Sequence, residues 1–181
     1  MNKGNRLIIK LIIIGLFLLP LASLNTNTVS AKTKISSEVS KKDRAENFTL
    51  EDQFGNKIGV NFPSDKIAVL IFGDRKGSEQ VEGWVRPLYA KYTDQIYIFG
   101  IAELSVVPWA VRPVVRTMIR NKSKTPVMLD WSGKVSKSYG YQKGKANVFV
   151  VGKNGSIIAI KRGAVSNEVL NELYQEINAV L

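Results

Sequence analysis

The 181-residue chain contains no cysteine and no histidine. Without cysteine it has no thiolate nucleophile, no disulfide bond and no soft metal ligand. Without histidine it lacks the side chain that most often acts as a base near neutral pH and that commonly binds zinc or copper. Acid–base chemistry would fall to Asp, Glu, Lys or Tyr, and only oxygen-ligated metals fit the composition. The sequence therefore predicts no thiol redox activity, no metal and no other cofactor.

Acidic residues are also scarce, with 15 Asp and Glu against 26 Lys and Arg and a net charge of +11. Such a balance favours acidic partners or anionic surfaces and does not indicate a fold. Hydrophobic residues make up 45% and charged residues 23%, which is typical of a globular protein. The length fits one domain preceded by a leader.

The N-terminal segment has the pattern of a secretory signal peptide. Three basic residues come before an apolar run at 11–19, and small residues at 29–31 precede a cleavage site, which predicts a mature chain beginning near Lys32. The basic residues are Lys3, Arg6 and Lys10. The alternative is an uncleaved membrane anchor over 7–24, which is short of the roughly 20 residues of a spanning helix. We expect a periplasmic or secreted protein, which excludes nucleic acid as a partner and allows membrane contact only through such an anchor.

From residue 48 onward, predicted strands and helices alternate, which is typical of an α/β domain. The apolar runs 67–72 and 95–102 are expected to be neighbouring parallel strands inside the sheet, joined by a helix over 78–92 that Ser78 caps. Residues 32–47 are polar and predict a flexible linker. The other expected strands are 48–50, 57–62, 127–129, 147–151 and 156–160, and the other expected helices are 108–121, 134–139 and 166–180, the last capped by Ser166.

Four short motifs follow one another along this domain. They are Phe48–Gly55, similar to F-x-L-x-D-x-x-G; Val69–Phe72 before a polar loop; Pro126–Asp130, similar to P-V-L-L-D; and Phe149–Val151 with Asn154-Gly155, similar to F-L-I-D-x-x-G. On these residues the chain resembles the thioredoxin-like superfamily, in its redoxin branch of alkyl hydroperoxide reductases and thiol-specific antioxidants. The resemblance covers 48–181 and implies a central mixed sheet flanked by helices, with an N-terminal β-hairpin.

The resemblance also implies an active site that this chain lacks. The family's cysteine stands where the central strand meets the next helix, which here is Gly77, Ser78 or Glu79 according to the register chosen. The family's cis-proline precedes the strand that carries Phe149, and that position falls near Ala146. Both halves of the family's active site are therefore absent.

A polar loop leads into the predicted helix that begins at Ser78. Free N–H groups and the helix dipole make such a place suited to an anion, and the fold implied by the resemblance brings the segment before the Phe149 strand beside it. We predict that these two segments form the cleft for a ligand or partner. Its residues are Asp74, Arg75, Lys76, Gly77, Ser78, Glu79, Lys145, Ala146 and Asn147. The alternative is that Asp74, Gly77 and Ser78 serve only the turn and the cap.

A basic stripe of Arg112, Arg116 and Arg120 recurs every four residues, opposite an apolar side formed by residues 111, 115, 118 and 119. The stripe could dock an acidic partner or anionic headgroups. The alternative is a solvated face whose cations suit the C-terminal end of the helix. The tryptophans are expected to be buried or half-buried packing residues. They are Trp84, Trp109 and Trp131.

Three functional hypotheses follow. The first is an exported, non-catalytic binding or accessory module whose partner is an extracytoplasmic protein or an anionic ligand. The second is a peroxiredoxin or thiol–disulfide oxidoreductase by fold alone, a weak warrant for activity. The third is a hydrolase that uses Ser78 with Lys76, which would need a lowered lysine pKa.

Overall fold

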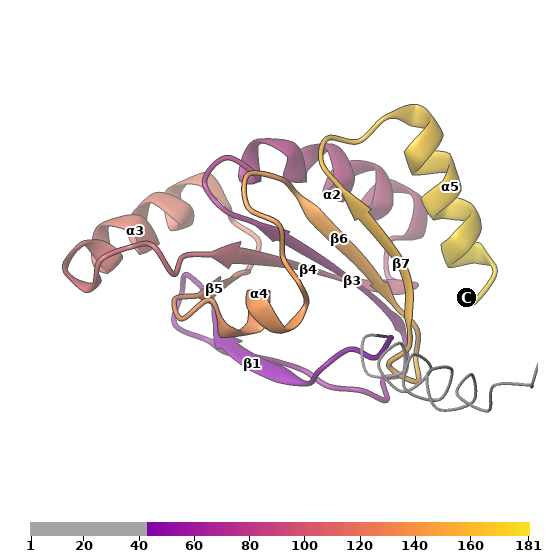
Figure 1. Cartoon of the computed structure of the whole chain (residues 1–181), viewed down its shortest axis with the longest axis horizontal. Helices are drawn as coiled ribbons and strands as arrows, with labels where there is room; N and C mark the ends of the chain where they lie inside the picture. The colour runs from indigo at the N-terminus through magenta and orange to yellow at the C-terminus, as the bar shows by residue number, and fades with distance from the viewer. Residues whose placement is uncertain (1–42) are drawn as a thin grey trace, which may run out of the picture.

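The computed structural model describes residues 43–181, which form a five-stranded mixed sheet, a two-stranded hairpin and flanking helices (Figure 1). The strands of the sheet lie in the order β5-β4-β3-β6-β7, and β1 pairs with β2. The strands are β1 (Phe48–Glu51), β2 (Lys57–Val60), β3 (Ile67–Gly73), β4 (Ile96–Glu103), β5 (Val127–Asp130), β6 (Asn147–Val151) and β7 (Ile157–Arg162). The helices are α2 (Ser78–Tyr92), the 3₁₀ turn η1 (Trp109–Val111), α3 (Arg112–Lys122), α4 (Lys134–Ser138) and α5 (Asn167–Asn178). The expected fold class is confirmed.

Strand β3 is the centre of the sheet, and all seven of its residues are buried. It pairs in parallel with β4 and antiparallel with β6. A continuous apolar run forms such a strand because both of its faces are covered. The predicted pairing of the two apolar runs as parallel interior neighbours is confirmed.

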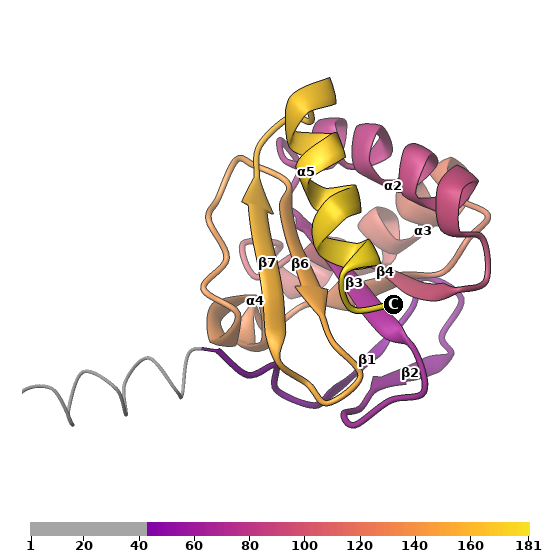
Figure 2. The ribbon, with the colours of Figure 1, turned by 90° about the vertical axis from the view of Figure 1, so that its right-hand side faces the viewer.

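Each face of the sheet has its own hydrophobic core. Helices α2 and α5 cover one face (Figure 2), where Trp84 and Leu173 pack with Val69 and Ile71 of β3. The hairpin and α4 cover the other face, where Phe72 lies within 5.5 Å, centroid to centroid, of Phe149 and of a tyrosine that follows α4. Successive residues of β3 therefore contribute to opposite cores, as the pleat of a strand requires.

Of the two predicted helix N-caps, one is confirmed and one is wrong. Ser166 accepts a hydrogen bond from the N–H of Val169, so its predicted capping role is confirmed. The predicted cap at Ser78 is wrong, because Gly77 holds the cap position and the Asp74 carboxylate accepts the Gly77 N–H. Asp74 reaches the first free donor from three residues upstream, which leaves Ser78 as the first residue of α2.

The predicted signal peptide lies outside the described residues, as does most of the predicted linker. The last part of that linker, 43–47, contacts the domain: the Ala45 N–H donates to the Gly155 carbonyl at 2.8 Å, and Arg44 donates to the Asn154 carbonyl at 2.9 Å. Between residues 43 and 181, no helix has the length and apolar character needed to cross a membrane.

Candidate functional site

The two segments of the predicted cleft lie against each other. The loop after β3 approaches the chain before β6 so closely that a Cβ on Gly77 would stand 2.4 Å from the carbonyl oxygen of Lys145. The backbone of Gly77 has an ordinary φ of −63°. Glycine is required here by the contact and not by the conformation.

Asp74 joins the two segments through both carboxylate oxygens. Its Oδ1 accepts the N–H of Gly77 and its Oδ2 accepts the N–H of Gly144, each at 2.7 Å. Its own N–H donates to the hydroxyl of Tyr141 at 2.8 Å. Burial alone would raise the pKa of Asp74, but the hydrogen bonds donated to its carboxylate outweigh burial and hold that pKa below its ordinary 3.8. We call residues 74–80 and 141–147 together the Asp74 joint.

The backbone donors at the start of α2 are used within this joint. The N–H of Ser78 donates to the Asp74 carbonyl at 2.8 Å, and the N–H of Gln80 donates to the Gly77 carbonyl at 3.0 Å. The Gln80 side chain accepts the N–H of Ala146 at 3.1 Å. The N–H groups that made this loop a predicted anion site therefore already have partners.

The same region contains the candidate Ser–Lys pair. The Ser78 hydroxyl donates to the Arg75 carbonyl at 2.8 Å. Within residues 43–181, no hydrogen bond joins it to Lys76. The Ser78 hydroxyl therefore bonds to the backbone of its own turn, and Lys76 is not placed to activate it as a nucleophile.

Two further cleft residues, Ala146 and Asn147, are buried. Ala146 stands directly before β6, and Asn147 is its first residue. The Asn147 side chain accepts the N–H of Gln142 at 2.9 Å and donates to the Lys145 carbonyl at 3.0 Å. Both residues hold the turn together and offer no polar group to a ligand.

What the joint presents to solvent is a set of cationic side chains. We call it the basic rim, and it consists of Arg75, Lys76, Lys143 and Lys145. Glu79 is exposed beside them. None of the four cations forms an ion pair with any residue of the described part of the chain. A ligand at the predicted cleft would meet these side chains.

The neighbouring strands β4 and β5 also end in carboxylates. Glu103 and Asp130 are paired in register and buried. Glu103 accepts the N–H of Ser105, and Asp130 accepts the N–H and hydroxyl of Ser136 at 2.8 Å each. No group of three or more possible metal ligands is present among residues 43–181. These carboxylates fix the loops that follow their strands.

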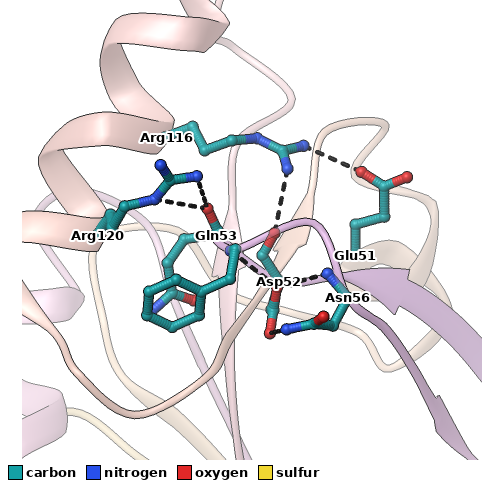
Figure 3. A network of polar contacts seen from close by, with 7 residues as sticks. Glu51, Asp52, Gln53, Asn56, Arg116 and Arg120 are labelled. Carbon is teal, nitrogen blue, oxygen red and sulfur yellow. Dashed lines mark hydrogen bonds and ion pairs between the residues drawn. The ribbon is translucent and has the colours of Figure 1, made fainter.

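The arginines of α3 bind the turn between β1 and β2 (Figure 3). Arg116 donates to the Asp52 carbonyl at 3.3 Å and pairs with the Glu51 carboxylate at 3.1 Å, and Arg120 donates to the Gln53 carbonyl at 2.9 Å. Both guanidinium groups are therefore bonded within the domain, although Arg116 is half-buried and Arg120 stays exposed, so the interpretation as a merely solvated face is incomplete. Backbone carbonyls at the turn are acceptors that water would otherwise occupy, and arginine reaches them with its forked donors.

The third arginine lies against a tryptophan. The guanidinium of Arg112 is 5.3 Å from the ring centroid of Trp131 and donates weakly to its carbonyl at 3.4 Å. A groove runs between this pair and η1. Its lining residues are Trp109, Arg112, Pro113, Arg116 and Trp131.

The orientation of α3, with Arg116 and Arg120 bonded to the β1–β2 turn, exposes part of its apolar side. Val115 and Ile119 are half-buried, as the prediction of an inward apolar side requires. Val111 and Met118 are exposed, so that prediction is wrong for these two residues. With α3 held in that orientation by the two arginines, its apolar side faces partly outward. Sequence reasoning also missed Val114, which is exposed on the same side.

The tryptophans differ from one another. Trp84 is fully buried, and its Nε1 donates to the Gly163 carbonyl at 2.9 Å. Trp131 is half-buried, which also agrees with the expectation. Trp109 is 81% exposed, so the expectation of a buried or half-buried packing residue is wrong for it. Its position in η1, directly after Pro108, holds it outside both cores.

The mixed sheet, the N-terminal hairpin and the helices on both faces define a thioredoxin-like fold. Three similar solved structures are an exposed lipoprotein thioredoxin (Etrx1) of Streptococcus pneumoniae, the thioredoxin domain of a thiol-disulfide oxidoreductase of Bacteroides vulgatus, and the peroxidoxin BcpB of Mycobacterium tuberculosis. All three are redoxin-type proteins, whereas this chain has no cysteine.

The similarity lies in the backbone. Etrx1 is 15% identical with a TM-score of 0.59, covering 72% of this chain and 99% of that one. The Bacteroides domain is 17% identical with a TM-score of 0.56, covering 76% and 97%, and BcpB is 17% identical with a TM-score of 0.57, covering 77% and 96%. No protein-family model and no curated protein sequence matches the chain. At these identities the similarity establishes the fold alone.

Proposed function

We propose that this chain is a non-catalytic binding module with a redoxin-like fold that works outside the cytoplasm. The observation that carries the proposal is the Asp74 joint. Where the resemblance places a reactive cysteine, Gly77 is packed against the Lys145 carbonyl and Ser78 is bonded to the Arg75 carbonyl. A joint built in this way holds no thiolate, and both thiol–disulfide exchange and peroxide reduction need one.

Export is supported by the sequence pattern at 1–31 and by the Streptococcus structure, whose name describes an exposed lipoprotein. An oxidising compartment permits cysteine, so its complete absence there fits a protein without a redox role. The mature chain is expected to begin near Lys32.

The partner is proposed to be an extracytoplasmic protein with an acidic surface or a smaller anionic ligand. The basic rim supports this, because its four cations are exposed and have no ion-pair partner in the part of the chain that the structure describes. Glu79 on the same rim would favour partners that also carry a cation. Charge of this kind mainly sets association rate and specificity.

Two turnover assays and one crosslinking experiment test the proposal. Insulin reduction and peroxide reduction, each with excess dithiothreitol, should not exceed the protein-free control, because both reactions need a thiolate. A photo-crosslinking amino acid at Lys145 should capture a partner in the native envelope, and one at the exposed Lys57 on β2 should not capture it. Turnover that scales with protein concentration would refute the non-catalytic role. Equal capture from both positions would refute the rim as the binding surface.

A further inference from the structure

Five large apolar side chains are exposed on η1, on α3 and on the loop before them. We call this set the apolar ridge, and it consists of Val106, Trp109, Val111, Val114 and Met118, which are 70%, 81%, 44%, 60% and 57% exposed. Val111, Val114 and Met118 follow one another at helical spacing and therefore lie on one side of the helix. Soluble proteins rarely gather apolar side chains in this way without a binding role.

The ridge is held in place from beneath. None of the eleven residues of α3 is fully buried, and its inward apolar residues Val115 and Ile119 are only half-buried. The hydrogen bonds of Arg116 and Arg120 to the β1–β2 turn add to this limited packing, together with the Glu51 ion pair (Figure 3). Arginine used in this way leaves the apolar side chains facing solvent in a defined orientation.

The stretch of chain that carries the ridge has charge of one sign. No acidic residue occurs between Glu103 and Asp130, and this stretch contains five cations. The cations are Arg112, Arg116, Arg120, Lys122 and Lys124, and the last three are exposed. An apolar surface flanked by these three exposed cations, on a stretch of chain without an acid, is complementary to a layer of apolar chains beneath anionic headgroups.

The side chains favour a membrane over an acidic protein. The ridge lies on α3 and the chain before it, on the β5 side of the molecule and apart from α5 (Figure 1). The lipid interface is deformable and accepts apolar side chains without a matching groove. Tryptophan is also favoured at that interface, because its ring is apolar and its N–H is polar.

We propose that the apolar ridge docks the domain onto anionic lipid membranes, with Trp109 entering the boundary between headgroups and acyl chains. This goes beyond the proposed function, because it concerns a different surface and holds whether or not the basic rim binds a partner. The vesicle measurements below do not depend on thiol chemistry, so the two proposals fail separately.

The experiment mixes the full chain with vesicles of phosphatidylcholine alone or containing about 30 mol% phosphatidylglycerol. Co-sedimentation measures binding, and quenching of Trp109 emission by lipids with brominated chains measures insertion. The Trp109→Phe variant identifies the Trp109 signal. The test variant is Val114→Gln with Met118→Gln, and the matched control is Tyr89→Gln, since Tyr89 is 63% exposed on α2. All variants keep the same N-terminal segment, so differences among them report on the ridge.

The wild type should bind anionic vesicles about tenfold more tightly than neutral ones, and about 0.5 M NaCl should remove most of that preference. The double variant should lose about tenfold in binding to anionic vesicles and lose the bromolipid quenching, whereas Tyr89→Gln should retain both. Equal binding by the wild type and the double variant would overturn the proposal. So would a Trp109 already shielded from acrylamide without vesicles, because a second copy or residues 1–42 would then cover the ridge.

Discussion

The Asp74 joint and the apolar ridge follow neighbouring parallel strands, β3 and β4, yet they use their side chains in opposite ways. In the joint, polar groups of the loop bond within the protein, and Gly77 has no room for one more methyl group. Beside the ridge, the arginines bond within the protein while large apolar groups face solvent. The segment that corresponds to the reactive loop of the fold holds the domain together and presents its basic rim to solvent, whereas the α3 side presents large apolar side chains.

The sharpest test of this contrast is Asp74→Ala. It removes two short, charge-assisted hydrogen bonds and leaves the N–H groups of Gly77 and Gly144 without their acceptor. We expect the free energy of unfolding to fall by about 3 kcal/mol. Urea unfolding followed by circular dichroism measures it.

Asp74→Asn is the matched control, because it keeps one carbonyl acceptor and should lose about half as much free energy. If Asp74→Ala lost less than about 1 kcal/mol, the carboxylate would not join the two segments, and the joint would be open to a ligand.

A second test inserts one methyl group. Gly77→Ala places a Cβ 2.4 Å from the Lys145 carbonyl oxygen, and backbone must move to admit it. We expect a loss of about 2 kcal/mol. The control is Gly100→Ala in β4. A Cβ added at Gly100 would have no neighbouring atom within 4 Å in the described part of the chain. A Gly77→Ala protein as stable as the wild type would show that the two segments separate readily.

The sequence predicted the parts of the fold that depend on local pattern. Apolar runs of strand length identified β3 and β4, because a strand covered on both faces has no polar side. Ser166 was recognisable as a cap because its bond reaches only three residues along the chain. The motif order was enough to predict the superfamily fold.

The orientation of α3 could not be read in this way. The helix has a basic stripe and an apolar side, and pattern alone assigns the apolar side to the core. The acceptors that draw Arg116 and Arg120 inward belong to a turn more than 60 residues upstream. Likewise, Asp74 and Gly77 lie close together in the sequence and predicted a turn, but the hydrogen bond from Gly144 to Asp74 spans 70 residues and could not be predicted. Contacts at such separations depend on the tertiary structure.

A third prediction uses pH. The pKa of Asp74 is lowered in the folded protein, so its contribution to stability is present above the ordinary pKa of 3.8 and is lost as the pH falls through the lower folded value. The unfolding free energy of the wild type should therefore fall more between about pH 5 and pH 3 than that of Asp74→Asn. The pKa of Asp52 is also lowered, by bonds from Asn56 and Phe54 that outweigh burial. Asp52 is the same in both proteins, so the difference isolates Asp74. Parallel pH profiles would contradict the assignment.

The smallest effect is expected at the ridge. Val114 and Met118 are 60% and 57% exposed, so replacing both with glutamine removes little buried apolar area. Glutamine also has a helix propensity close to that of methionine and better than that of valine. The unfolding free energy in the absence of vesicles should therefore change by less than about 0.5 kcal/mol, measured by urea unfolding.

The comparison variant is Arg120→Gln, because Arg120 bonds the helix to the Gln53 carbonyl and does not belong to the ridge. It should lose about 1 kcal/mol, which is more than the ridge substitutions lose. Stability then depends on the arginine side of α3, and the apolar side is free to serve a surface outside the domain. A ridge variant that unfolds more readily than Arg120→Gln would reverse this order. Val114 and Met118 would then be packing residues, and the contrast with the Asp74 joint would disappear.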